Sequence, residues 1–156
     1  MLTRVRALSP VVGIVLMLVC TVVLGSAVAL TAATAPTDPT PTAAVAVDAD
    51  PGDDRIALTH RGGDVLDVRD LALRVTVAGE PLDRQPPVPF FSASGFDPGP
   101  TGPFNLAADP EWRAGETASF RVAGTNDPGI EPGDRVRVVV SVDGGRVASA
   151  ETTARN

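Results

Sequence analysis

The chain has 156 residues, enough for one small domain, and its 13 basic residues, all arginine, stand against 19 acidic ones. The single histidine and single cysteine exclude a disulfide framework, a cysteine-based zinc site and a multi-histidine metal centre. The formal net charge of -6 argues against nucleic-acid binding, which depends on Lys and Arg neutralising phosphates. We therefore expect no cofactor, no metal site and no nucleic-acid partner.

The first part of the chain differs in charge and hydropathy from the rest. Its only charged residues before residue 36 are Arg4 and Arg6, and residues 11–35 are almost wholly apolar or small. As a helix those residues would extend roughly 37 Å, more than the ~30 Å of a bilayer core. The sequence predicts a transmembrane helix over residues 8–35 in a single-pass cell-membrane protein, with a cytoplasmic N-terminus and an extracellular C-terminal domain.

Two other interpretations of this segment need to be weighed. A secretory signal peptide would also begin with basic residues and an apolar run, and Ala27-Val28-Ala29 could serve as its cleavage site. A lipoprotein signal at Cys20 is disfavoured because Val19, not a small residue, precedes the cysteine. If the helix is retained, Gly25 and Ala29 form a small-xxx-small pair for close helix packing, and Gly13 lies on another face.

The junction at the start of the apolar run distinguishes between these interpretations. It reads Arg6-Ala7-Leu8-Ser9-Pro10-Val11-Val12-Gly13, and Ser9 and Pro10 are suited to cap and begin a helix. Over residues 4–25 the chain resembles the N-terminal segment of haloarchaeal type IV pilins, which typically reads R-A-V-S-P-V-I-G-V-I-L-M. Bacterial type IV pilins carry Glu at the position of Val12, so the resemblance is to the archaeal branch.

The resemblance implies a processing step and a function. A prepilin peptidase would cut between Ala7 and Leu8, with Arg6, Ala7 and Leu8 as the processing residues and residues 1–7 as the leader. The helix would then remain in the mature chain and drive self-assembly. The implied protein is a structural subunit of an archaeal type IV pilus-like surface filament, used for adhesion.

A Pro/Thr linker over residues 36–42 separates the helix from an exterior domain over residues 43–156. Its three prolines cannot continue a helix and favour an extended spacer. The domain contains segments with alternating apolar and polar residues, which predict half-buried antiparallel strands. These segments are Ala43–Asp48, Arg55–His60, Leu71–Ala78, Thr117–Ala123, Arg135–Asp143 and Val147–Thr153, with Val88–Ser94 as an optional addition. The predicted fold class is an N-terminal transmembrane α-helix followed by a small all-β, immunoglobulin-like sandwich domain.

Three features of the exterior domain are candidate sites. His60 and Asp64, across a Gly-Gly turn, are either a base oriented by a carboxylate or a turn histidine bonded to backbone, and we favour the second. The segment from Ile56 to Leu66 also resembles pilin-type exterior domains, in which a strand ending in His precedes a Gly-Gly-Asp turn. Four aspartates over residues 48–54 could begin a Ca²⁺ loop but lack a closing glutamate, so a solvated loop is favoured.

The third feature is an aromatic cluster within a proline-rich stretch, formed by Phe90, Phe91, Phe96, Phe104 and Trp112. It is either an exposed recognition loop or a connection that completes the core, and we favour core closure with Trp112 fully packed. The excess of Asp over Glu and the lack of lysine indicate a protein adapted to strong salt.

Two functional hypotheses result. The first is the filament subunit described above. The alternative is a membrane-tethered exterior β-sandwich binding module that does not polymerise and that uses the aromatic loop for a ligand. A secreted hydrolase is a third and weaker possibility, because no nucleophile, base and orienting group can be named together; we expect the protein not to be an enzyme.

Overall fold

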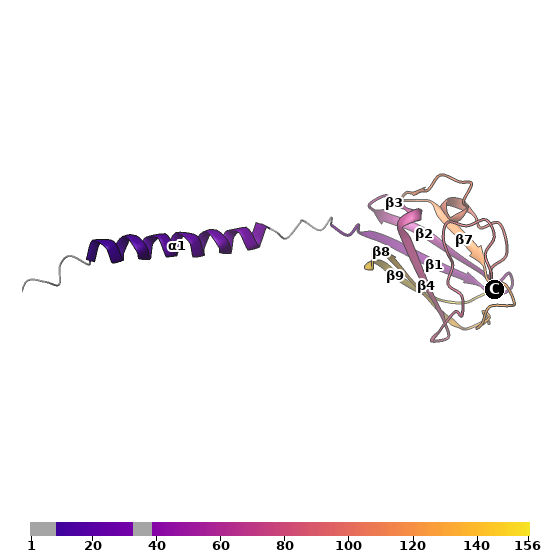
Figure 1. The fold of residues 1–156 in the computed structure, drawn as a ribbon. Coiled ribbons are helices and arrows are strands. Elements are labelled where there is room, and N and C mark those ends of the chain that lie inside the picture. Colours follow the sequence, from indigo (N-terminus) through magenta and orange to yellow (C-terminus); the bar gives the residue numbers. More distant parts are fainter. Residues whose placement is uncertain (1–8, 33–38) are drawn as a thin grey trace, which may run out of the picture. The chain divides into compact units, whose positions relative to one another are not determined.

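The computed structural model describes residues 9–32 and 39–156, with side chains described for 10–24 and 39–156. The chain divides into two compact units, Met1–Pro39 and Thr40–Asn156 (Figure 1).

The first unit contains one helix, α1, over Ser9–Ala32. It begins at the Ser9-Pro10 pair that the sequence marks as a helix start, and it contains no acidic residue in its first turn and no basic residue in its last. The segment is rich in Val, Leu and Ala and has no proline after Pro10 in its first turn, so nothing in it breaks the helix.

The prediction of a transmembrane helix in a single-pass membrane protein is wrong on this structure. Among the described residues, no helix combines the length and apolar character needed to cross a bilayer. The predicted span extended to residue 35, three residues beyond the end of α1 at Ala32.

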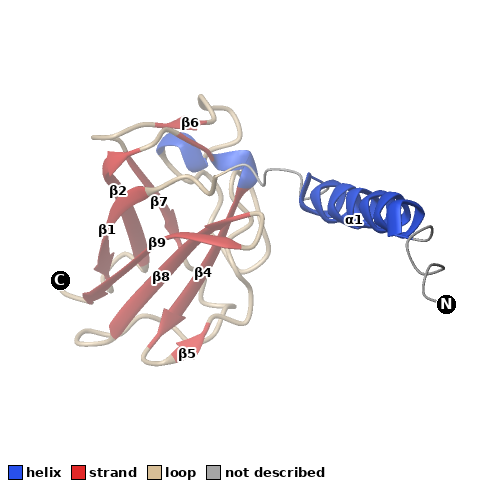
Figure 2. Ribbon diagram, turned by 90° about the vertical axis from the view of Figure 1, so that its left-hand side faces the viewer, coloured by secondary structure: helices blue, strands red, loops and turns tan. Residues whose placement is uncertain are grey.

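The second unit has a β-sandwich-like fold, as predicted, and is compatible with an immunoglobulin-like arrangement. One sheet has the strand order β1-β2-β7, the other β5-β4-β8-β9, and β3 and β6 form a small separate ribbon (Figure 2). All pairings between these strands are antiparallel. The strand bounds are β1 Ala43–Asp50, β2 Arg55–Gly63, β3 Leu66–Asp67, β4 Leu71–Val77, β5 Glu80–Pro81, β6 Glu111–Trp112, β7 Thr117–Arg121, β8 Arg135–Val142 and β9 Gly145–Thr153.

Alternation of side chains places one face of each long strand in the core. In β8, Val136, Val138 and Val140 are buried, whereas Arg135 and Arg137 are exposed on the other face. The β4–β8 register pairs Val75 with Val138, so valines of both strands meet on the inner face. The six predicted strands therefore occur with small changes at their ends.

The stretch between β5 and β6 was predicted less well. Val88–Ser94 forms no strand; Phe90 makes only an isolated bridge to Asn105, and Ala93 one to Phe96. The short strands β3, β5 and β6 were not predicted. Two 3₁₀ turns, η1 over Val68–Asp70 and η2 over Gly102–Phe104, complete the unit.

The hydrophobic core lies entirely within this unit. Its largest fully buried side chains include Trp112, Phe104, Phe120, Ile56 and Leu58. Rings from the connection between β5 and β7 pack edge-on, with Phe104 5.3 Å from Trp112 and Phe96 5.6 Å from Phe120 between ring centroids. Because residues 39–156 contain their complete core, we expect them to fold without the helix.

Candidate functional site: helix α1 and the surfaces of the β-sandwich

Helix α1 presents apolar side chains in every direction. Consecutive residues from Ile14 to Val19 are each at least 53% exposed, and Met17 reaches 75%. Since six consecutive residues cover more than a full turn, no single face of the helix is polar. The hydroxyl of Thr21 donates to backbone carbonyls of the preceding turn, at 2.6 Å from Met17 O and 3.0 Å from Leu18 O, which satisfies its donor within the helix.

The predicted helix-packing residues lie on this element. An added Cβ at Gly13 would meet no atom within 4 Å, so this position leaves open space beside the helix. Gly25 and Ala29 are part of α1, but their surroundings lie outside the described side chains. The processing residues Arg6, Ala7 and Leu8 lie outside the described residues, and cleavage there stays a prediction.

His60 is fully buried and is bonded to backbone rather than paired with a carboxylate. Its Nε2 lies 2.8 Å from the carbonyl oxygen of Asp64, and its ring meets Trp112 edge-on at 5.5 Å. Among the described residues its Nδ1 has no hydrogen-bond partner. The Asp64 carboxylate instead accepts from the Thr42 amide at 2.9 Å. The arrangement is a structural turn, as favoured from the sequence.

This turn holds the start of the sandwich. The Asp64 amide donates to Thr42 O at 2.8 Å while its carboxylate accepts from Thr42 N, so both backbone groups of Thr42 are bound. Gly63 has φ +104°, and a Cβ there would lie 2.3 Å from Thr42 O. The Gly-Gly-Asp turn therefore clamps the chain immediately before β1.

The acidic residues of 48–54 lie at the end of β1, which includes Asp48 and Asp50, and in the tight turn 51–54 that joins β1 to β2. Asp50 accepts from the Gly52 amide at 2.9 Å and lies 4.0 Å from Arg55. Among the described residues, no group of three or more His, Cys, Asp or Glu side chains is placed to hold a metal ion. A solvated loop accounts for these contacts.

The aromatic cluster mainly completes the core, as favoured from the sequence. Phe90, Phe96, Phe104 and Trp112 are buried. Phe91 and Leu106 are instead exposed, at 62% and 65% respectively. The sequence did not predict their exposure. The amide of Leu106 donates to Phe90 O at 3.1 Å, and the amide of Phe90 donates to Phe104 O at 2.9 Å. These bonds form a backbone bridge between Phe90 and Asn105, and Phe91 and Leu106 are the next residue on each side of it.

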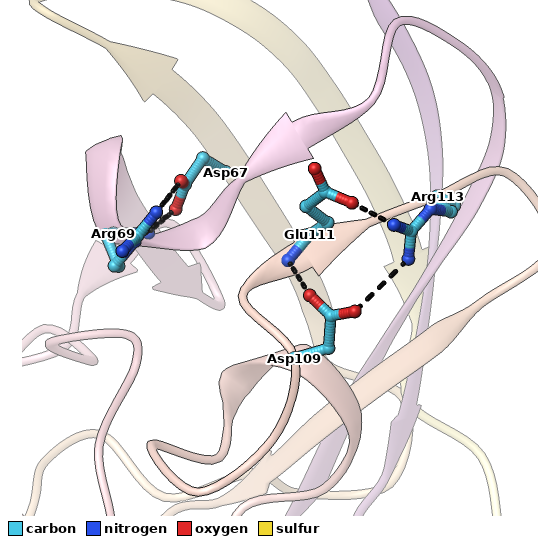
Figure 3. Close-up of polar contacts among 5 residues, drawn as sticks. All are labelled: Asp67, Arg69, Asp109, Glu111 and Arg113. Atoms are coloured by element: carbon cyan, nitrogen blue, oxygen red, sulfur yellow. Dashed lines mark hydrogen bonds and ion pairs between the residues drawn. The ribbon is translucent and has the colours of Figure 1, made fainter.

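A cluster of charged side chains covers the β3–β6 ribbon (Figure 3). Arg69 forms an ion pair with Asp67, and Arg113 forms ion pairs with Glu111 and, at 3.5 Å, with Asp109. Hydrogen bonds from the side chain and backbone of Arg69 lower the pKa of the Asp67 carboxyl to about 2, and the same pairing raises the pKa of Arg69. Since the cluster is exposed, it contributes little to stability.

Two polar side chains that the sequence did not single out join loops to the sheets. Gln85 binds both backbone groups of Val75 at the edge of β4, with Val75 N to Oε1 at 2.6 Å and Nε2 to Val75 O at 3.1 Å. Buried Asn126 accepts from Arg84 N and donates to the carbonyls of Arg84 and Gly95. Each takes the place of a missing backbone partner.

The outer face of the four-stranded sheet carries a groove. A cavity of about 560 Å³ is lined from β4, β8 and β9 and the adjoining turns, including Thr76, Arg135, Arg137, Glu151 and Thr153. Glu151 bridges the two arginines, at 3.1 Å to Arg135 Nε and 2.7 Å to Arg137 Nη2.

Comparisons with known proteins assign no family. No protein-family model and no curated protein matches this chain.

Proposed function

We propose that this chain is a structural subunit of a type IV pilus-like surface filament, in which α1 packs against α1 of other copies and the β-sandwich lies on the outside for adhesion. The observation that carries the proposal is the apolar surface of α1. Exposed fractions of 53–75% on consecutive side chains leave the helix uncovered in the isolated chain. Copies of the same helix would bury this surface on all sides, which is what a filament core requires.

The sequence around residues 4–25 supports the same function. It resembles the haloarchaeal type IV pilin start, and α1 begins at the Ser9-Pro10 pair of that motif. Processing before Leu8 would leave the whole of α1 in the mature subunit. The mature chain should therefore be lighter than the encoded one by residues 1–7, and replacement of both Arg6 and Ala7 by Asp should prevent that loss.

Close packing of the helices gives the decisive test. Gly25→Leu keeps the helix apolar but adds a branched side chain where neighbouring backbones would approach, so filaments should be strongly reduced. Val19→Leu is the comparison variant, since it adds only one methylene to a side chain that already occupies the helix surface, and it should reduce filaments much less than Gly25→Leu. The measurement is the amount of subunit in sheared surface filaments relative to cell-associated subunit. Equal ratios for the parent and both variants would refute the proposal.

A second candidate is a β-sandwich binding module that does not polymerise. The observation that favours it is that Phe91 and Leu106, which follow the bridged residues Phe90 and Asn105, are both exposed, since contiguous exposed apolar patches mark contact surfaces. In that case Phe91→Ser with Leu106→Ser would abolish attachment to a surface, while Gly25→Leu would have no effect on it. A filament-dependent adhesin would lose attachment with Gly25→Leu as well.

A further inference from the structure

The outer face of the four-stranded sheet carries a band of arginines, formed by Arg74, Arg135, Arg137 and Arg146. Arg74 comes from β4, Arg135 and Arg137 from β8, and Arg146 from β9. These three strands are neighbours in one sheet (Figure 2). All four side chains are exposed. Paired residues, and residues two apart on one strand, lie on the same face of a sheet. Thr76, two residues after Arg74, pairs with Arg137. Ser141, on the same face of β8 as Arg137, pairs with Arg146.

The arginine band has a net charge opposite in sign to that of the rest of the domain. Residues 39–156 contain 11 arginines and 18 acidic residues. Four of those arginines lie in the band, and Glu151 is the only acid that β4, β8 and β9 contribute to it. The remainder of the domain is left with seven arginines against 17 acids. One sheet face is thus basic on a domain that is otherwise strongly acidic.

The band retains free hydrogen-bonding capacity. Glu151 accepts from Nε of both Arg135 and Arg137, which fixes the two guanidinium groups side by side without using all their donors. In the described part of the chain, Arg74 and Arg146 form no ion pair. Asp134 also lines the groove, but its Oδ2 accepts from the Glu131 amide at 2.9 Å. Carboxylates of a partner would find several unoccupied donors here.

We propose that the arginine band is a docking surface for a second copy of this chain, which it binds through that copy's acidic surface. This rests on the proposed filament and deepens it by naming a contact between outer domains. The band and the acidic remainder are different surfaces of one molecule, so the contact is heterologous and each bound copy presents a new band. Such contacts repeat along an open assembly.

Charge complementarity favours a second copy over other acidic partners. The required acidic surface is present in equal amount with every band, because both belong to the same chain. Guanidinium–carboxylate pairs act at contact distance, so they persist where salt screens longer-range attraction. A soluble polyanion is the alternative occupant and is an explicit outcome of the test.

The test measures self-association of residues 39–156 by sedimentation equilibrium, in the lowest KCl concentration at which the domain is folded. Arg74→Glu with Arg146→Glu should weaken association at least ~10-fold, a change of about 1.4 kcal/mol. Arg61→Glu with Arg121→Glu is the matched control: it makes the same charge change at exposed positions of the other sheet and should leave the dissociation constant within ~2-fold. Circular dichroism verifies folding of both.

The direction of the contact has its own signature. The Arg74→Glu/Arg146→Glu variant keeps its acidic surface, so it should bind to wild-type assemblies at one end and stop their growth. The average mass of the mixture should fall further than with an equal amount of the control variant. A monomeric wild type, equal weakening by both double variants, or binding of dextran sulfate by a wild type that stays monomeric would each overturn the proposal.

The result is independent of the helix-mediated filament. A monomeric domain in a full-length chain that still forms filaments removes this docking surface and leaves the proposed function intact. If the isolated domain associates through the band but the full-length chain forms no filaments, the docking surface is retained and the proposed filament function is refuted.

Discussion

Removal of the Gln85 amide should destabilise the β-sandwich, because that amide substitutes for a neighbouring strand at the edge of β4. Its Oε1 accepts from Val75 N at 2.6 Å, and its Nε2 donates to Val75 O at 3.1 Å and to Leu82 O at 3.0 Å. Val75 is fully buried. Gln85→Met retains the length of the side chain and removes all three hydrogen bonds.

The size of the effect follows from which groups lose their partner. Val75 O keeps a second donor, the Leu82 amide at 3.1 Å, so it stays satisfied. The Val75 amide loses its acceptor, and a buried unsatisfied donor costs about 1–3 kcal/mol. With the lost bond to Leu82 O, we expect a destabilisation of about 2–3 kcal/mol, or a fall in Tm of roughly 6–12 °C for a domain of this size.

The assay is urea unfolding of residues 39–156, followed by the fluorescence of Trp112, the only tryptophan and fully buried. Arg84→Met is the control, since it alters the neighbouring exposed side chain and leaves the Arg84 amide bonded to Asn126. Its unfolding free energy should remain within ~0.5 kcal/mol of the parent. If Gln85→Met also falls within that margin, Gln85 does not satisfy the edge of β4.

Three further predictions concern the turn before β3, the charged ribbon and the salt response. Gly63→Ala should destabilise residues 39–156 by about 3 kcal/mol or more in the same assay, because the φ of Gly63 is +104° and the new Cβ would clash with Thr42 O. The control Gly62→Ala, which has open space around the new Cβ, should cost under ~1 kcal/mol. Similar losses of stability for the two variants would contradict the clamping role of the turn. In an NMR titration the Asp67 carboxyl should titrate near pH 2, and Arg69→Gln should return its pKa toward 3.8; since the folded pKa is lowered, the pair stabilises the fold above the ordinary pKa and loses this contribution as pH falls through about 2. The Tm of residues 39–156 should rise with KCl, because 18 acids repel one another against only 11 arginines; a flat or falling Tm would argue against adaptation to salt.

The alternation of apolar and polar residues was sufficient to predict the position of each strand that buries one face. Arg135–Val142 alternates exposed arginines with buried valines, and its predicted position differs from the observed strand by one residue at the end. The same logic located β2, β4 and β7. The ends of these strands depend on hydrogen bonds to distant segments, which explains why β2 continues to Gly63 beyond the expected His60.

The connection between β5 and β7 could not be predicted in detail, because its structure comes from contacts between distant residues. Its prolines and aromatic residues show no regular alternation, so they do not indicate a strand. The burial of Phe90 and the exposure of Phe91 depend on one backbone bridge between Phe90 and Asn105. Gln85 belongs to the same class: nothing local in its sequence indicates that an amide will bind Val75, ten residues earlier. The first unit is a different case, because the apolar run does form α1 over Ser9–Ala32, whereas no helix among the described residues has the length and apolar character needed to cross a bilayer.

The arginine band illustrates what topology adds to a local pattern. Alternation alone predicts that Arg74 lies on the solvent face of β4 and that Arg135 and Arg137 lie on the solvent face of β8. Only the pairing of β4 with β8 brings these residues together, and only the pairing of β8 with β9 adds Arg146 and the bridging Glu151. Each arginine is unremarkable on its own strand, whereas four on one sheet face, with a single acid among them, form a surface that the acidic remainder of the same chain complements.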